Sequence, residues 1–250
     1  MATDLSLQSS LDKEAEHLAQ MLFANKPGQS ADFARTLLDI HRQVRGKEFL
    51  LIHNPGGYGN KSLDRCLKWE RSAVTGVSDA IDQLEYTWVL TQHFRASSGC
   101  LGLIKNVKGL CRLSDRKVNI MVQKLQFIAR HNPSLKIIMI SISQGAAFSN
   151  AVMQRLNEFP QVYSIELGIF FLHKPQRVLG ERTLAIDSNG TSPDAAYQGD
   201  ILNIAKTYLT APFRLLKYRL QGNPKTITYC VNVPGHNYDW SYPAVRLQIE

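Results

Sequence analysis

The sequence predicts an α/β fold in which helices cover a mostly parallel sheet of about six strands. Short apolar runs alternate with stretches of helical periodicity at least five times along the chain. These runs do not alternate cleanly in polarity, which is typical of strands covered on both faces. A chain of 250 residues is also long enough to bury a large core. We therefore expect a three-layer sandwich, with residues 1–46 as an N-terminal helical extension and residues 47–250 as one α/β domain.

Two helices are expected before the first strand. In residues 10–24 the apolar positions Leu11, Ala15 and Leu18 recur at helical spacing, and the segment 25–28 (NKPG) ends that helix. A second helix is expected over residues 30–45.

Strands and helices alternate after residue 46. Strands are expected at 48–53, 86–91, 135–141, 162–172, 183–188 and 226–233. Helices are expected at 62–84, 116–131, 145–159 and 200–220, the last one broken near Pro212. The stretch 95–115 is basic and dotted with glycine, so we expect a mobile loop or an added helix there.

Cysteine spacing and apolar run length exclude several classes of protein. The four cysteines form no CxxC pair, which argues against a closed zinc site and a disulfide framework; they are Cys66, Cys100, Cys111 and Cys230. Reduced thiols and a cytoplasmic location are expected. No apolar run approaches the roughly 20 residues that span a bilayer. No glycine-rich phosphate loop occurs, so neither a cofactor nor a metal is expected.

The formal net charge is +8, from 29 Lys and Arg against 21 Asp and Glu. A positive field attracts nucleic acid, anionic membrane or acidic substrates without choosing among them. No zinc finger or RNP-type strand is present, so no nucleic-acid partner is expected. The oligomeric state is not predicted.

A serine lies in a short turn between an expected strand and an expected helix. Ser143 has the small residues Ser141 and Gly145 two positions away on either side. A strained strand-to-helix turn around a nucleophilic serine needs small residues at these positions. Two interpretations stay open: Ser143 is a nucleophile, or it is an ordinary N-cap at the start of a helix.

A base and an acid are expected after the serine, in the order serine, acid, histidine. His236 lies in a glycine turn three residues past the last expected strand, where a general base should come. His173 precedes every candidate acid, which is the wrong order. The acid is either Asp194, in the turn after the fifth expected strand, or Asp187, within it. Asp194 is preferred, because such an acid usually lies a few residues past its strand and orients the imidazole.

Two backbone amides are expected to stabilise a developing oxyanion. The first is that of Gln144, at the start of the helix after Ser143. The second should come from the loop after the first strand, where Pro55 has no N–H. Gly56 or Gly57 would therefore supply it.

These segments resemble the α/β-hydrolase superfamily over about residues 47–245. The resemblance rests on 53–57 (HNPGG) at the place of the oxyanion loop, 141–145 (SISQG) as the nucleophile elbow, and 235–236 (GH) after the last strand. More narrowly, the chain resembles chlamydial proteins of unknown function that carry an HSQG elbow. Their later segment of histidine, aromatic residue and Ser-Pro is echoed by 236–243 (HNYDWSYP). The resemblance implies a hydrolase fold and a Ser-His-Asp triad, and two departures, Ser141 and the 54–55 (NP) pair, leave an inactive member open.

Two functions follow as expectations. The first is a serine hydrolase of carboxylic esters, including lipid esters and acyl thioesters. The second is a non-catalytic binding protein of the same fold, with peripheral contact to an anionic membrane through basic segments at 95–117 and 200–220. For the helix at 200–220, its place between two expected strands favours packing of its apolar face on the sheet over membrane contact.

Overall fold

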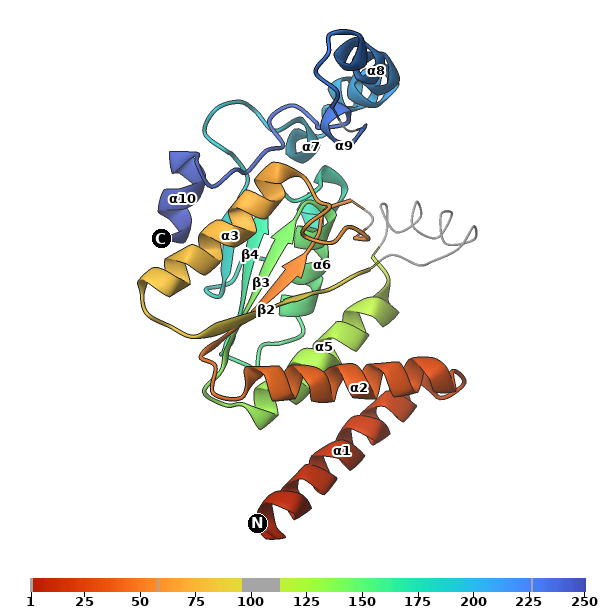
Figure 1. The fold of residues 1–250 in the computed structure, drawn as a ribbon, viewed down its shortest axis with the longest axis vertical. Coiled ribbons are helices and arrows are strands. Elements are labelled where there is room, and N and C mark those ends of the chain that lie inside the picture. The colour runs from red at the N-terminus through yellow and green to blue at the C-terminus, as the bar shows by residue number, and fades with distance from the viewer. Residues whose placement is uncertain (1, 58, 96–112, 226) are drawn as a thin grey trace.

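The structure is a computed structural model that describes residues 2–57, 59–95, 113–225 and 227–250. Its centre is one sheet of five parallel strands in the order β2-β1-β3-β4-β5 (Figure 1). The strands are β1 (Phe49–Asn54), β2 (Trp88–Gln92), β3 (Lys136–Ile142), β4 (Val162–Leu167) and β5 (Thr183–Ile186). The predicted α/β class with a parallel sheet is confirmed.

Helices cover both faces of the sheet. One face packs against α5 (Asp115–His131) and α6 (Gln144–Met153), and the other against α3 (Lys68–Gln83) and α10 (Pro243–Ile249). Side chains of β1 alternate between the two cores: Leu50 and Ile52 face α5, while Phe49 and Leu51 face α3. This alternation of apolar side chains on both faces explains why the strands read as continuous apolar runs.

The N-terminal extension consists of α1 (Ala2–Phe23) and α2 (Pro27–Val44). Figure 1 shows α2 lying across α5 while α1 projects from that end of the molecule. Leu11, Ala15 and Ala19 of α1 are buried in the same core as α5. The two helices therefore extend the layer on one face of the sheet.

Four expectations about the elements are wrong. The strand expected at 226–233 is not formed: residues 227–230 make the short helix α9 (Ile227–Cys230), and α10 contacts β5. The fourth strand ends at Leu167, because Gly168 adopts φ +53 and the 3-10 helix η1 (Phe171–Gln176) follows. The helix α8 (Ile201–Leu220) continues through Pro212. Its apolar side does not pack on the sheet, since Leu209 and Phe213 are each 74% exposed.

Within the described ranges, no helix has the length and apolarity needed to cross a membrane. Cys66 and Cys230 are both free thiols. The expectations for Cys100 and Cys111, and for most of the basic stretch 95–117, fall outside the described residues.

Candidate active site

The carboxyl ends of β1 and β3 meet near the middle of the sheet. These strands are neighbours, while β2 lies beyond β1 and β4 lies beyond β3. The connections after β1 and β3 therefore run to opposite sides of the sheet, which makes this place a topological switch point. Parallel α/β sheets bind their ligands in the crevice that forms there, outside the carboxyl ends of the strands. The register pairs Asn54 of β1 with Ser141 of β3. Residues 53–57, called here the 53–57 loop, therefore lie beside Ser143.

Ser143 occupies a strained turn between β3 and α6. Its φ of +54 lies in the left-handed region, which non-glycine residues seldom adopt. Ser143 is the N-cap residue of α6 by position, but its side chain makes no capping hydrogen bond to this helix. The Ser143 amide donates to the Leu167 carbonyl at 2.9 Å, which fixes the turn to β4. The serine is half-buried between the buried residues Ile142 and Gln144, so part of its surface is open to solvent.

The two small residues around Ser143 have separate structural reasons. The Ser141 hydroxyl is buried, lies 2.6 Å from Ser149 Oγ, and accepts from Asn54 Nδ2 at 3.3 Å. The buried Ser141 hydroxyl therefore has hydrogen-bond partners at this position. Gly145 approaches β1 so closely that an added Cβ would lie 2.3 Å from the Asn54 carbonyl oxygen. No larger residue fits there without moving the backbone.

Asp194 and His236 form a buried acid–histidine pair. His236 Nδ1 donates to Asp194 Oδ2 at 2.8 Å, and the side chains are 12% and 0% exposed. Asp194 Oδ1 accepts from the amides of Ala196 and Tyr197, the first turn of the short helix α7 (Ala195–Gln198). The carboxylate is thus fixed by the backbone on one oxygen and orients the imidazole with the other. This is the pairing expected of the preferred acid and the predicted base.

A tyrosine completes the environment of Asp194. The buried Tyr238 hydroxyl donates to Asp194 Oδ2 at 2.5 Å. Burial acts to raise the pKa of Asp194, but the bond and charge of His236 and the Tyr238 hydroxyl outweigh it, so this pKa is lowered. Burial and the neighbouring Asp194 charge raise the pKa of Tyr238, which keeps its hydroxyl protonated as a donor. Asp194 therefore remains an anion facing the imidazole.

Hydrogen bonds join the turn that carries His236 to the turn that precedes Asp194. Asn189 Nδ2 donates to the carbonyls of Gly235 and Asn237 at 3.1 and 2.8 Å, one on each side of His236. Gly235 adopts φ +71, and a Cβ there would lie 1.9 Å from the Pro193 carbonyl oxygen. These contacts fix the two loops against each other.

The second acid candidate, Asp187, is engaged elsewhere. Arg177 Nη1 donates to both Asp187 oxygens at 2.8 and 2.7 Å, and Arg177 Nε donates to Glu166 Oε2 at 2.9 Å. Burial raises the pKa of Glu166 to about 7 despite the guanidinium. Within the described part of the chain, no hydrogen bond joins Asp187 to a histidine. The structure therefore pairs His236 with Asp194 and not with Asp187.

The 53–57 loop packs against the serine turn. A Cβ added at Gly56 would lie 3.8 Å from Ser143 Cβ. The Gly56 amide donates to Glu70 Oε1 at 3.2 Å, and His53 Nε2 donates to the same oxygen at 3.0 Å. Of the two predicted donors, Gly56 is thus directed at a carboxylate in this structure, and Gly57 follows it with φ +55.

A buried arginine joins the 53–57 loop to the start of α6. The Arg95 guanidinium donates to the carbonyls of Pro55, Gly57 and Gln144, the last at 3.3 Å. Burial lowers the pKa of Arg95 to about 10, which leaves it a cation at neutral pH. Because three carbonyls converge on one side chain, Arg95 fixes the spacing between the loop and the serine turn.

Ser143 and His236 lie at the same sheet edge without a direct bond. No hydrogen bond between described residues joins Ser143 Oγ to His236. The two are connected through the start of α3, where Trp69 packs edge-on against His236 at 5.9 Å between ring centroids and Glu70 binds the Gly56 amide. Catalytic hydrogen bonds are often long before substrate binds.

A second histidine lies near the serine turn. Gln144 Nε2 donates to Nε2 of the buried His173 at 3.1 Å. The sequence order excluded His173 as the base. It contacts the side chain that follows Ser143, so it supports the start of α6.

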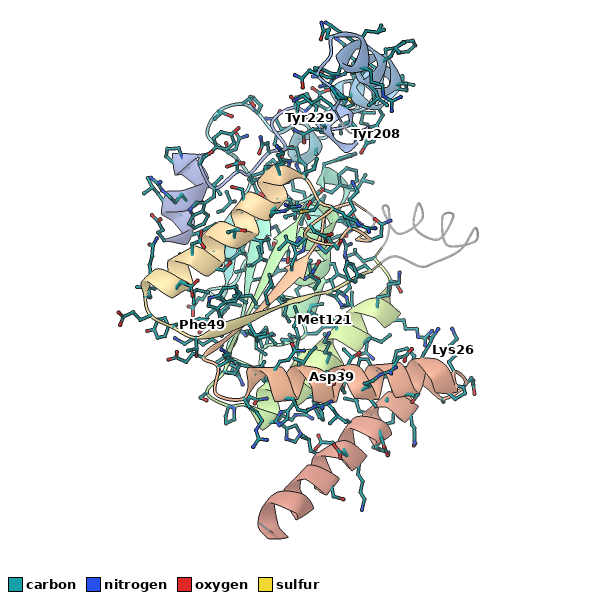
Figure 2. The ribbon with its side chains drawn as sticks, viewed as in Figure 1. Lys26, Asp39, Phe49, Met121, Tyr208 and Tyr229 are labelled. Carbon is teal, nitrogen blue, oxygen red and sulfur yellow. The ribbon has the colours of Figure 1, made fainter. Side chains whose placement is uncertain are left out.

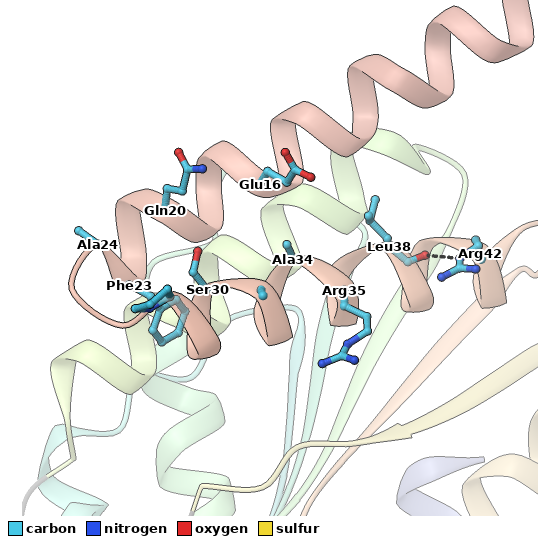
Figure 3. A pocket seen from close by; sticks show the side chains of 11 residues that line it. Glu16, Gln20, Phe23, Ala24, Ser30, Ala34, Arg35, Leu38 and Arg42 are labelled. Carbon is cyan, nitrogen blue, oxygen red and sulfur yellow. Dashed lines mark hydrogen bonds between the residues drawn. The ribbon is translucent and has the colours of Figure 1, made fainter.

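Two cavities differ in how close they lie to the proposed catalytic residues. A cavity of about 410 Å³ is lined in part by Asp187, Asp194 and Tyr197, on the outer side of the acid. A larger groove of about 740 Å³ lies between α1 and α2, where its lining includes Glu16 and Gln20 of α1 and Ser30 of α2 (Figure 3). The groove contains neither a histidine nor a cysteine and is remote from the serine turn. No group of three metal-ligating side chains is found in the described part of the chain.

The sequence does not single out several residues of this site. Trp69, Glu70 and Arg95 come from segments that carry no motif. Only the folded chain brings Glu70 and Arg95 to the 53–57 loop and Trp69 to His236. Position alone gave a weak indication of two further site residues. Tyr238 lies two residues after His236, and Asn189 lies in a turn before Asp194.

Comparison with known proteins assigns no family to the chain. No protein-family model matches the chain, and no curated protein sequence matches it. The function is therefore inferred from the residues and their geometry.

Proposed function

We propose that the protein is a serine hydrolase of carboxylic esters, with an α/β-hydrolase arrangement of its catalytic residues. The observation that carries this proposal is the 2.8 Å contact between His236 Nδ1 and Asp194 Oδ2, at the same sheet edge as the strained Ser143 turn. The chain order of serine, acid and histidine agrees with that of this architecture. The carboxylic esters include lipid esters and acyl thioesters.

The proposed reaction begins with attack of Ser143 Oγ on the acyl carbon. His236 Nε2 takes the hydroxyl proton and returns it to the leaving alcohol or thiol, which leaves an acyl group on the serine. A water molecule then attacks the acyl carbon and loses its proton to the same nitrogen. The bond from the acyl carbon to Ser143 Oγ breaks, His236 returns the proton to Ser143 Oγ, and the carboxylic acid is released. Throughout, Asp194 holds the Nδ1–H tautomer and stabilises the imidazolium.

The oxyanion is expected to lie between the start of α6 and the 53–57 loop. Gln144 is the first residue of α6, and first-turn amides point outward at the positive end of a helix. Gly57 is the preferred second donor, because the Gly56 amide is directed at Glu70. Arg95 would preserve the separation of these donors by holding carbonyls on both sides.

The proposal predicts that Ser143→Ala removes ester hydrolysis. We expect kcat/KM for p-nitrophenyl acetate and longer p-nitrophenyl esters to fall by about 10³-fold or more, because the nucleophile is lost. The matched control is Ser192→Ala, an exposed serine in the turn before Asp194, which should retain wild-type rates. Unchanged hydrolysis in Ser143→Ala, or no hydrolysis by the folded wild type, would contradict the proposal and favour a non-catalytic binding protein.

A further inference from the structure

The helix α8 stands away from the sheet at one end of the molecule (Figure 1). Its main contacts are with the short helices α7 and α9. Thr207 and Ala211 are its only buried side chains, and both lie on the side toward those helices. The opposite side of α8 has no described protein segment packed on it. Figure 2 shows side chains of α8 projecting into open space beyond Tyr208.

Five large apolar side chains line this outward side. They follow one another at intervals of seven, four, three and four residues, which places them on one side of a helix. Their exposed fractions are high: Leu202 84%, Leu209 74%, Phe213 74%, Leu216 56% and Leu220 79%. We call them the apolar stripe. Exposed contiguous apolar surface of this kind marks an interaction site or a membrane contact.

The charged residues of α8 itself, after its N-cap Asp200, are all positive. Lys206, Lys217 and Arg219 are exposed on the same helix, and Arg214 lies between them along the chain. Residues 201–238 contain no Asp or Glu. A surface that covers the apolar stripe must therefore be apolar at its centre and negative at its border.

We propose that α8 docks in the headgroup region of an anionic phospholipid bilayer. A helix of 20 residues is about 30 Å long, and an amphipathic helix with cations beside its apolar face lies in the plane of such an interface. It would lie on the bilayer, since no described helix is suited to crossing one. A second copy of the chain fits less well, because two such faces would bring cations of the same sign together.

Docking of α8 would also tether the proposed active site to a lipid surface. The segment from α7 to α9 leaves the core directly after Asp194 and returns directly before His236. Its two ends are joined where the Ala195 amide donates to the Pro234 carbonyl at 3.1 Å. A bilayer beneath α8 would thus be tethered to the acid–histidine pair through the two ends of this segment. This step rests on the proposed hydrolase function, and it assigns acyl lipids as the substrate class.

The docking is tested by sedimentation with phosphatidylcholine vesicles that contain or lack phosphatidylserine. The wild type and Ser143→Ala are both expected to bind the anionic vesicles, because Ser143 is not part of the stripe. The variant Leu209→Ser/Phe213→Ser/Leu216→Ser should bind more than tenfold more weakly. The variant Lys206→Glu/Lys217→Glu should lose at least about 25-fold, at roughly fivefold for each cation removed near an anionic surface and more for each carboxylate added.

The controls replace equally exposed residues elsewhere. Leu84→Ser/Leu179→Ser/Leu247→Ser removes three exposed leucines away from α8, and Lys13→Glu/Lys61→Glu makes the same charge change; both should bind as the wild type. Failure of the wild type to bind anionic vesicles, equal binding by the stripe variant, or a dimer that the stripe variant dissociates would overturn the docking proposal. Ester hydrolysis measured without vesicles reports on the hydrolase proposal separately.

Discussion

Asp194→Asn is expected to lower kcat for ester hydrolysis by about 10⁴-fold with little change in the fold. The asparagine Oδ1 can still accept from the amides of Ala196 and Tyr197, so the start of α7 is kept. Its amide nitrogen, however, would face His236 Nδ1 as a donor. The imidazole would then carry its proton on Nε2 and could not accept one from Ser143. Steady-state kinetics with a p-nitrophenyl ester checks this.

Asp187→Asn is the matched control, because Asp187 was the alternative acid from the sequence. It loses charge from an ion pair with Arg177 and touches neither His236 nor Ser143 in the structure. We expect kcat near the wild-type value. A large loss of kcat in Asp187→Asn together with an active Asp194→Asn would contradict the assignment of the acid.

Gly145→Ala is expected to lower the free energy of unfolding by about 3 kcal/mol and to abolish hydrolysis. The new methyl group would lie 2.3 Å from the Asn54 carbonyl oxygen and 3.0 Å from that of Pro55, so β1 and α6 must separate. The move would pull the 53–57 loop away from Ser143. For a chain of this size, the loss corresponds to a fall in Tm of about 6–12 °C, measured by thermal unfolding.

Gly180→Ala is the control for the loss of a glycine. A Cβ at Gly180 meets nothing within 4 Å, and its backbone is not in the left-handed region. Its Tm and activity should match the wild type within error. If Gly145→Ala were as stable and active as Gly180→Ala, the close packing of α6 on β1 would not support the site.

Most of the sheet could be predicted because its strands are buried on both faces. β1 and β3 carry apolar residues without polar alternation, and helices with helical periodicity separate the strands. The prediction of a strand at 226–233 was wrong because a short run of β-branched and aromatic residues is ambiguous between strand and helix. For α8, the apolar stripe was visible in the sequence, but its direction depends on tertiary packing, which periodicity does not report.

The site could be predicted where local backbone requirements coincide with chemistry. Ser143 needs small neighbours, and His236 follows a glycine turn, so both can be found from spacing. The preference for Asp194 over Asp187 also followed from its place in the turn after the fifth strand. The pairing of Asp187 with Arg177 and the roles of Glu70 and Arg95, by contrast, depend on side-chain contacts between segments. Such contacts between distant segments have no local sequence signal.

The most direct test of the hydrolase proposal is labelling with a fluorophosphonate probe, followed by mass spectrometry of the modified peptide. We expect one probe adduct on Ser143, with labelling lost in both Ser143→Ala and His236→Ala, because the probe reacts only with a serine activated by its base. A folded wild type that is not labelled, or labelling at a serine other than Ser143, would contradict the account.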